Sequence, residues 1–200
     1  MLTHNEVWRR YLALHYPPLL LLLAAALVQG SGGGEYLQYD RPAILDGQIW
    51  RLWTAHLVHL GWGHYLLNAA GLMLVWGLFR DNMQLRAWCW HFLFAGLAIG
   101  LGLLWFDPGL FWYVGLSGIL HALFIAGLLA DIRQHKGLGV LVLLGFWAKI
   151  IFEQIYGPLP GSERSAGGPV VVDAHLYGAI AGVISYAIHS GVRKLKHFSR

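Results

Sequence analysis

Apolar residues gather in long runs separated by shorter polar stretches, and this alternation organises the whole chain. A helix needs about 20 predominantly apolar residues to cross a bilayer. Each run that approaches this length is expected to form a membrane-spanning helix. Six such runs cover residues 14–30, 58–79, 84–105, 114–130, 138–156 and 170–190. The pattern predicts an all-α membrane protein, built as a bundle of six transmembrane helices.

The overall composition agrees with this prediction. Hydrophobic residues make up 57% of the 200-residue chain and charged residues only 12%, whereas a soluble domain usually carries about 25% charged residues. The length leaves room for several spans but not for a large additional domain. Because five apolar runs follow the first, we expect the first run to stay in the protein rather than to act as a cleaved signal peptide.

The positive charges are distributed unevenly along the chain. A net charge of +4 would by itself allow a nucleic-acid partner. Ten of the fourteen Lys and Arg residues, however, fall on one side of the predicted membrane, namely Arg9, Arg10, Arg80, Arg86, Arg133, Lys136, Arg193, Lys194, Lys196 and Arg200. Cytoplasmic loops are enriched in Lys and Arg, so we expect both termini in the cytoplasm and no nucleic-acid partner. The chain then divides into a cytoplasmic segment (1–13), a membrane core (14–190) and a basic cytoplasmic tail (191–200).

The first outer connection, residues 31–57, is not a plain hydrophilic loop. The stretch DGQIWRLWTAHLVHL, from Asp46 to Leu60, is amphipathic and rich in aromatic side chains. Segments of this kind favour the membrane interface. We expect this connection to lie in the interface or to fold into the outer leaflet as a membrane-embedded loop.

Three polar residues within the predicted spans lie at a common depth. Polar and ionisable groups are costly inside a bilayer, so each is a candidate functional residue. At a helical rise of about 1.5 Å per residue, Ser117, His175 and His64 each lie about 20–22 Å from the cytoplasmic end of their own span. Their three spans run in the same direction, so the side chains reach one level. The shared depth predicts a single site assembled from three spans.

A helix from Ser117 to Ala130 would be about 20 Å long. This is too short to cross the roughly 30 Å hydrocarbon core of a bilayer by itself. We therefore expect the segment DPGLFWYVG, from Asp107 to Gly115, to enter the membrane as irregular backbone. Such backbone persists in a bilayer only where it is buried in protein or lines a wet cavity. The sequence thus predicts Ser117 near a helix N-terminus, at the floor of a water-accessible hollow.

These residues could supply the parts of a serine hydrolase. A serine hydroxyl becomes a nucleophile when an imidazole accepts its proton, and His175 is the candidate base for Ser117. His64 and Asn68, at positions i and i+4, share one face of their helix. Together with the backbone N–H of Ser117, they could stabilise an oxyanion.

Glycines lie close to both proposed partners. Gly118 follows Ser117, while Gly178 and Gly182 lie near one face of the sixth span. Small residues at this spacing allow two helices to approach closely. We expect these glycines to bring the fourth and sixth spans together, so that His175 reaches Ser117.

Other roles compete with these assignments. Ser117 between its glycines could serve only helix packing, and His64 and Asn68 could form interhelical hydrogen bonds. The eleven histidines would also permit a membrane metal-binding or transport protein, although no HExxH motif is present.

The remaining charged residues within the spans have simpler expected roles. Asp173 lies about 200° around a helix from His175, so it is a poor candidate for a triad and a better one for a helix cap. Lys149 and Glu153, at positions i and i+4, could neutralise each other.

Four segments resemble the rhomboid family of intramembrane serine proteases, in matching order and span placement. They are Trp50-Arg51, HLGWGHYLLN from His59 to Asn68, GLSG from Gly115 to Gly118, and AHLYGAIAG from Ala174 to Gly182. The resemblance extends over about residues 14–190 and implies a six-span rhomboid-like core.

The resemblance implies a serine endopeptidase that needs neither cofactor nor metal. Ser117 would be the nucleophile and His175 the general base of a dyad without an aspartate. The substrates would be transmembrane segments of other proteins, entering sideways from the lipid bilayer near the fifth span. The family pattern also gives supporting roles, around the oxyanion and in the first outer loop, to His64, Asn68, Gly115, His121, Trp50 and Arg51.

One departure from the family pattern concerns His121. Many rhomboids have a tyrosine there that stacks on the catalytic histidine, and we expect His121 to stack on His175 or to hydrogen-bond to it. His121, the sequence DAH at 173–175, and KIIFEQIYGP from Lys149 to Pro158 resemble the rhombosortase branch. Members of that branch are thought to process proteins with a C-terminal Gly-Gly sorting helix, which implies a bacterial inner membrane. An inactive rhomboid-like protein that binds transmembrane segments without cutting them remains the alternative.

Overall fold

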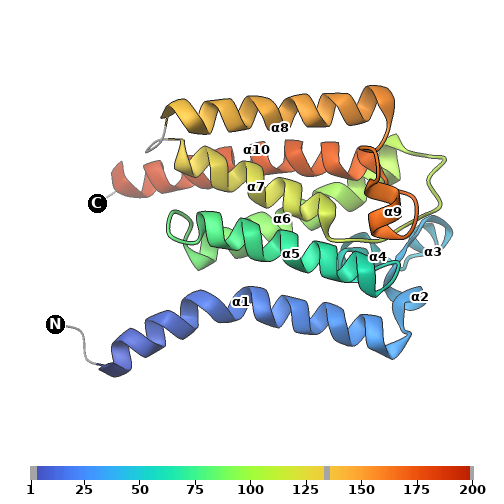
Figure 1. Ribbon diagram of the computed structural model, residues 1–200, viewed down its shortest axis with the longest axis horizontal. Helices are drawn as coiled ribbons and strands as arrows, with labels where there is room; N and C mark the ends of the chain where they lie inside the picture. Colours follow the sequence, from blue (N-terminus) through green and yellow to red (C-terminus); the bar gives the residue numbers. More distant parts are fainter. Residues whose placement is uncertain (1–3, 133–135, 199–200) are drawn as a thin grey trace.

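The computed structural model describes residues 4–132 and 136–198, with side chains described for 17–132 and 137–192. Long helices form most of the described chain and lie side by side (Figure 1). They are α1 (His4–Ser31), α5 (Trp62–Phe79), α6 (Leu85–Phe106), α7 (Ser117–Asp131), α8 (Lys136–Tyr156) and α10 (Val172–Phe198).

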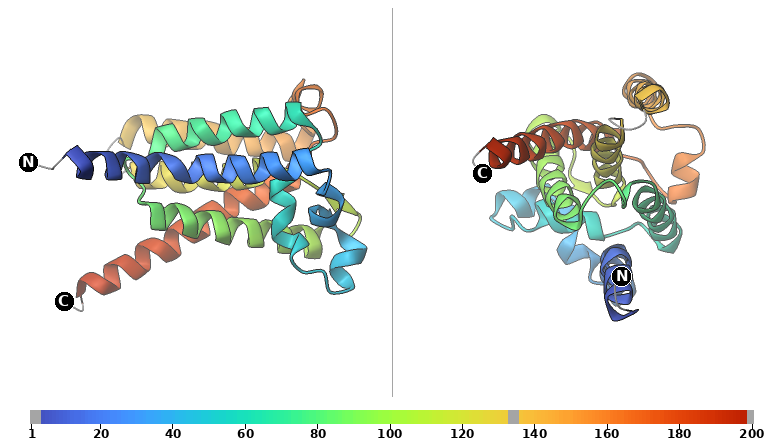
Figure 2. Two further views of the ribbon diagram at one scale, coloured as in Figure 1. Left: turned by 90° about the horizontal axis from the view of Figure 1, so that it is seen from below. Right: turned by 90° about the vertical axis from the view of Figure 1, so that its left-hand side faces the viewer.

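Helix α7 lies at the centre of the bundle, where α5, α6, α8 and α10 surround it (Figure 2). Ile119, Ala122 and Ile125 of α7 are completely buried. Helices α1 and α8 lie on opposite sides of the bundle (Figures 1 and 2), and both expose many large apolar side chains. This distribution, with a tightly packed centre and outer helices that expose apolar side chains, suits a bundle surrounded by lipid.

Each predicted span overlaps one of the long helices, but the ends differ. Helix α1 begins at His4, well before residue 14, and α10 continues to Phe198 through most of the segment predicted as a separate tail. Among the described residues, Leu85–Phe106 and Gly137–Tyr156 have the length and hydropathy expected of membrane-crossing helices. The six-span count and the division into 1–13, 14–190 and 191–200 stay predictions.

The start of α1 and the end of α10 lie at the same end of the molecule (Figures 1 and 2). This arrangement fits termini on one side of a membrane. The side chains on which the predicted orientation mainly depends lie outside the described ones, namely Arg9, Arg10, Arg133, Lys136, Arg193, Lys194, Lys196 and Arg200.

The first outer connection folds into a series of short elements beside the bundle. These are α2 (Gly34–Leu37), β1 (Tyr39–Asp40), α3 (Arg41–Leu45), α4 (Arg51–Thr54) and the 3-10 turn η1 (Ala55–Leu57). The buried Arg51 organises the connection, because its guanidinium donates to the Gln48 side chain at 2.7 Å and to two backbone carbonyls, those of Glu35 and Gln38, at 2.8 and 2.9 Å. Trp50 is half exposed and donates to the Tyr36 carbonyl at 3.3 Å.

Glycines on α6 allow this connection to pack directly on the helix. A Cβ atom at Gly96 would lie 2.5 Å from the Trp53 ring, and one at Gly100 would overlap the Leu52 carbonyl. This glycine pair therefore packs against the outer connection.

The segment between α6 and α7 is largely irregular, as its sequence indicates, but it contains one short strand that the sequence analysis did not predict. Strand β2 (Trp112–Tyr113) pairs antiparallel with β1, with Tyr39 opposite Tyr113 and Asp40 opposite Trp112. The pairing attaches the approach to α7 to the first outer connection. The remaining short helix, α9 (Ser162–Ala166), lies in the connection between α8 and α10.

Helices α7 and α10 touch backbone to backbone. A Cβ atom at Gly178 would overlap the carbonyl oxygen of Gly118, and one at Gly182 would lie 2.6 Å from the Ala122 carbonyl oxygen. A Cβ atom at Gly118 would lie 2.8 Å from the carbonyl oxygen of Ala174. Since only glycine avoids these overlaps, the three residues set the distance between the two helices.

This contact predicts a strong effect of one added methyl group. Gly178→Ala would force α10 away from α7, and overpacking of this kind typically costs about 1–3 kcal/mol. The expected result is a lower midpoint of thermal unfolding in detergent. Gly145→Ala is the matched control, because a Cβ atom there meets nothing within 4 Å. Equal midpoints for the two variants would contradict the close contact.

Candidate active site

Ser117 is the first residue of α7 and is partly exposed. Gly115, two residues before Ser117, has a φ of +122°, a backbone conformation that residues other than glycine rarely adopt. The Gly115 N–H donates to the Ala55 carbonyl at 3.1 Å, and the Tyr113 hydroxyl donates to the Gly115 carbonyl at 2.8 Å. The turn that leads to Ser117 is therefore held in place by the first outer connection.

His56 completes this attachment. Its Nε2 lies 3.0 Å from the Gly96 carbonyl oxygen on α6, and its Nδ1 lies 3.3 Å from the Gly115 carbonyl oxygen. Burial lowers the pKa of His56 to about 4, so the ring is neutral at pH 7 and donates one proton, best placed on Nε2. These contacts hold the loop that carries His56 against α6 and against the turn before α7.

His175 of α10 meets Ser117 directly. Its Nε2 lies 3.0 Å from the Ser117 Oγ, within normal hydrogen-bonding distance. Ala174, the residue before His175, contacts Gly118, the residue after Ser117, so the helix contact brings the two side chains together.

A carboxylate lies on the other side of the imidazole, where the family resemblance implies none. The Nδ1 of His175 lies 3.0 Å from the Oε2 of Glu153, a buried residue of α8. An ionised carboxylate can only accept a hydrogen bond, so His175 carries its proton on Nδ1 and offers the Nε2 lone pair to Ser117. Sequence reasoning missed this contact because it assigned Glu153 to Lys149, although a carboxylate in an apolar run was itself a signal.

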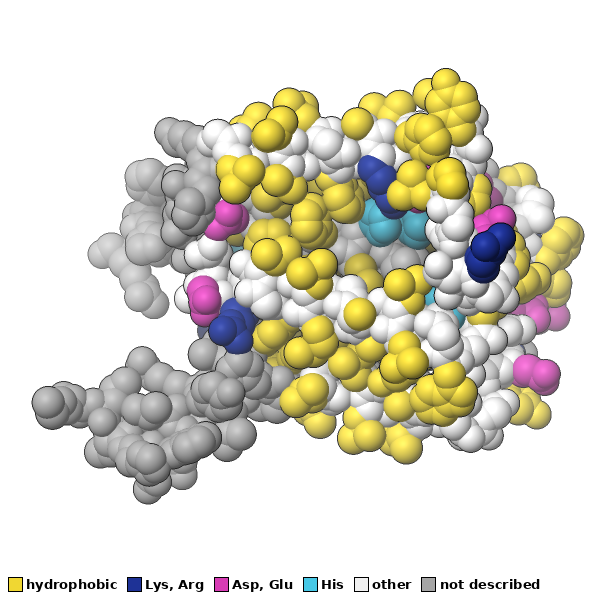
Figure 3. Space-filling model, viewed as in Figure 1, with side chains coloured by type: hydrophobic (Ala, Val, Ile, Leu, Met, Phe, Trp, Pro, Cys, Tyr) yellow, Lys and Arg dark blue, Asp and Glu magenta, His cyan; other side chains and the backbone are white. Residues whose placement is uncertain are grey.

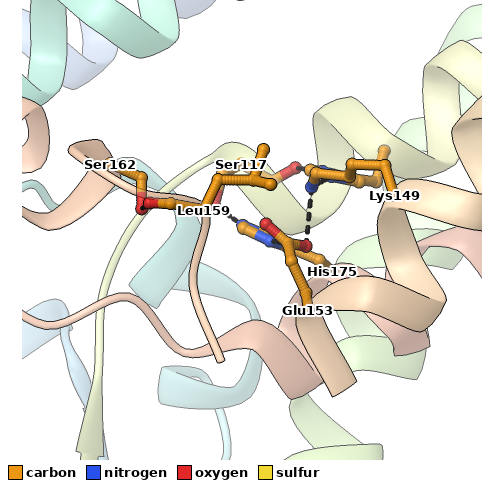
Figure 4. Close-up of polar contacts among 7 residues, drawn as sticks. Ser117, Lys149, Glu153, Leu159, Ser162 and His175 are labelled. Carbon is orange, nitrogen blue, oxygen red and sulfur yellow. Dashed lines mark hydrogen bonds and ion pairs between the residues drawn. The ribbon is translucent and has the colours of Figure 1, made fainter. Parts of the chain in front are cut away.

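Lys149 and His121 extend the network. The Lys149 ammonium lies 2.7 Å from the Glu153 Oε2 and 2.6 Å from the His121 Nε2. The His121 Nδ1 lies 2.8 Å from the Ser117 carbonyl oxygen, and the His121 ring stacks on His175 with centroids 4.1 Å apart and planes 11° apart. Figure 4 shows Ser117, His175 and Glu153 in sequence, with Lys149 directed at the carboxylate.

His64 of α5 lies against the turn that precedes Ser117, and Asn68 follows it one helical turn later. A Cβ atom at Gly115 would lie 2.9 Å from the His64 ring, so only glycine lets the ring approach. The Leu60 N–H donates to the His64 Nδ1 at 3.3 Å, which leaves the proton of a neutral ring on Nε2. Asn68 is buried and donates to the His64 carbonyl at 3.1 Å. His64 can therefore act as a hydrogen-bond donor beside Gly115.

His121, Glu153 and His175 form a group with metal-ligating atoms within 4.8 Å of one another. These atoms already have partners. The Lys149 ammonium contacts two of them, Glu153 and His121, and a metal cation would have to displace it. The cation that His121 and Glu153 contact in this structure is therefore the Lys149 ammonium.

The molecular surface is hollowed between α8 and α5, and Lys or Arg and His side chains are visible inside the hollow (Figure 3). Ser117 is partly exposed, and the Lys149 side chain is 25% exposed. The polar network is therefore reached from the side of the bundle. Other predicted residues lie elsewhere: Trp50 and Arg51 belong to the outer connection, and Asp173 lies within the first turn of α10 rather than at its cap.

The fold and the site define a class, a helical membrane protein with a serine–histidine pair inside its bundle. The family model described as the Rhomboid domain matches residues 46–191, and the chain belongs to the rhomboid family. Members of this family are in general intramembrane serine proteases that act on membrane-embedded substrates. No curated protein matches the chain significantly.

The buried, neutral state of His56 predicts a pH-dependent stability. Its pKa is about 4 in the folded protein, against about 6.5 when exposed, so the unfolded chain binds the proton first. Stability contributed by the neutral ring is present above pH ~6.5 and is lost as the pH falls towards ~4. Thermal unfolding in detergent across this range should show a falling midpoint, with a smaller fall for His56→Gln. An identical fall in the variant would contradict neutral burial of His56.

Proposed function

We propose that this protein is an intramembrane serine endopeptidase with Ser117 as nucleophile and His175 as general base. The observation that carries the proposal is the 3.0 Å contact between the Ser117 Oγ and the His175 Nε2 at the start of a buried helix. The membership in the rhomboid family supports the same chemistry.

In the proposed reaction, the Ser117 Oγ attacks the carbonyl carbon of the scissile peptide while the His175 Nε2 takes the hydroxyl proton. The tetrahedral intermediate collapses as His175 gives that proton to the leaving amine, which breaks the C–N bond. A water molecule then attacks the acyl-enzyme, with His175 again accepting a proton, and the Ser117 hydroxyl is restored. The net reaction is hydrolysis of one peptide bond.

The negative charge on the intermediate requires donors placed in advance. The first N–H groups of a helix have no partner within it, and Ser117 heads α7. His64 can donate from Nε2 because the Leu60 N–H occupies its Nδ1. We assign the oxyanion to these two groups; the Asn68 amide donates to the His64 backbone carbonyl one turn away.

We further propose that the substrate enters through the hollow between α5 and α8 (Figure 3). A transmembrane segment arriving from the lipid would meet Ser117 without crossing the bundle. Helix α8, which carries Leu144 and Ile155 with 62% and 65% exposure, would form one wall of this entrance.

The rhombosortase branch is our proposal for the finer assignment. It rests on the sequence features at His121, at residues 173–175 and in KIIFEQIYGP. The corresponding substrates are proteins with a C-terminal Gly-Gly sorting helix. The corresponding location is a bacterial inner membrane, with both termini cytoplasmic and the catalytic core over residues 14–190.

The nucleophile assignment predicts the labelling pattern of a fluorophosphonate probe. The wild-type protein should label at Ser117, and Ser117→Ala and His175→Ala should reduce labelling to background, because each removes one half of the nucleophile–base pair. Ser185→Ala is the matched control: Ser185 also contacts a histidine, His91, at 2.8 Å, but it is completely buried. Labelling that survives in Ser117→Ala would contradict the assignment.

The substrate assignment predicts a dependence on the Gly-Gly motif. A membrane reporter that ends in a Gly-Gly sorting helix should be cleaved, and a version with both glycines replaced by leucine should be cleaved at least about tenfold more slowly, since specificity ratios of this size need only ~1.4 kcal/mol. Equal cleavage of both reporters would overturn the rhombosortase assignment and retain the protease. Absence of both labelling and cleavage would favour an inactive rhomboid-like protein, and stoichiometric metal in the purified protein would favour a metal-binding one.

A further inference from the structure

We propose that Glu153 is a positioning residue for His175, and that Lys149 holds Glu153 in place by bridging it to His121. The inference deepens the proposed function and rests on it. It adds a third member to the site, a glutamate on α8, where the family resemblance implies only two.

Each hydrogen bond in the network can be assigned one donor and one acceptor without conflict. The Ser117 hydroxyl donates to the His175 Nε2, and the His175 Nδ1 donates to the Glu153 Oε2. Lys149 donates to the same Oε2 and to the His121 Nε2. The His121 Nδ1 donates to the Ser117 carbonyl. No pair of groups competes for the same proton, so the resting arrangement holds His175 in the tautomer that a general base requires.

The charges in the network are also balanced. Glu153 is only 3% exposed, and a lone carboxylate at such a site would be costly. The Lys149 ammonium, 2.7 Å away, cancels its charge. When His175 takes the Ser117 proton, the new imidazolium lies 3.0 Å from the same carboxylate. Glu153 thus stabilises the charge that appears during the reaction, and it does so without touching the substrate.

His121 supports the imidazole from a second direction. Its ring lies flat against His175, with centroids 4.1 Å apart. The stacked ring fixes the plane of His175, whereas Glu153 fixes its tautomer and its rotation within that plane. Two supports imply that loss of one weakens the base without removing it.

Both members of the ion pair belong to α8, a helix that lies at the edge of the bundle and exposes most of its apolar side chains (Figure 1). Helices α7 and α10, which carry Ser117 and His175, are joined by glycine contacts that do not involve α8. The nucleophile and the base thus belong to one closely joined pair of helices, and the carboxylate that contacts His175 comes from a third helix, α8.

The first test compares Glu153→Gln with Glu163→Gln, the same chemical change in α9 of the outer connection. Glu153→Gln leaves the Lys149 charge unbalanced near the imidazole, which opposes formation of the imidazolium. We expect kcat for a cleaved membrane reporter to fall by about 10²-fold, less than the roughly 10⁴-fold known for a triad aspartate in another fold, because His121 still supports the ring. KM should remain unchanged, and Glu163→Gln should behave as wild type. An unchanged kcat in Glu153→Gln overturns the proposal.

A double variant separates positioning from mere folding. Lys149→Met in the Glu153→Gln background restores a neutral site, so the double variant should recover part of the activity that Glu153→Gln loses. If Glu153 only held α8 in place, removing both polar residues would lower the activity further. A double variant less active than Glu153→Gln therefore overturns the proposal.

The proton itself gives a readout that does not depend on cleavage. A hydrogen bond from an imidazole N–H to a carboxylate produces a low-field proton resonance in NMR spectra. We expect this resonance in the wild type and in Ser117→Ala, and we expect its loss in Glu153→Gln and in His175→Ala. Its absence from the wild type, or its persistence in Glu153→Gln, overturns the proposal. If the wild type neither labels nor cleaves, the proposed function fails, and the resonance alone decides the role of Glu153.

Discussion

The backbone contact between α7 and α10 is the constraint on which the site depends. The Ala174 carbonyl lies against Gly118, and the Gly118 carbonyl lies against Gly178. Ala174 is next to His175 in the sequence, and Gly118 is next to Ser117. The register of the glycine contacts therefore sets how the serine and the histidine align. Without a hydrophobic driving force between helices in lipid, such close contact is a principal source of helix association. The same contact thus supports the bundle and aligns the reacting groups.

The other end of the Ser117 segment is held by a part of the chain that lies outside the bundle helices. Tyr113 pairs with Tyr39, and Gly115 bonds to Ala55, so the first outer connection fixes the turn before α7. This connection is itself fastened to α6 at two glycines and is organised by a buried arginine. The irregular backbone before the N-terminus of α7 therefore makes hydrogen bonds to protein groups, as backbone within a membrane requires.

Much of this arrangement could be predicted from the sequence, because its causes are local. A fixed helical rise placed Ser117, His175 and His64 at one depth, and the apolar runs located the long helices to within several residues. The contact between Glu153 and His175 could not be predicted, since it depends on the rotation of α8 about its own axis, and Lys149 offered Glu153 a partner within the helix. Two-residue strands are too short to leave a periodic signal. The six-span count, the orientation and the substrate stay predictions.

A second serine–histidine pair in the same bundle illustrates what a distance alone leaves undecided. Ser185 and His91 lie 2.8 Å apart, closer than Ser117 and His175, yet both are almost completely buried. Ser185 lies in the interior of α10, where the backbone N–H groups donate within the helix and none is left for an oxyanion. Ser117 instead begins a helix, is partly exposed and has a histidine bonded to a carboxylate. The start of α7 and the access from the side, rather than the hydrogen bond itself, distinguish the candidate nucleophile from a buried structural serine.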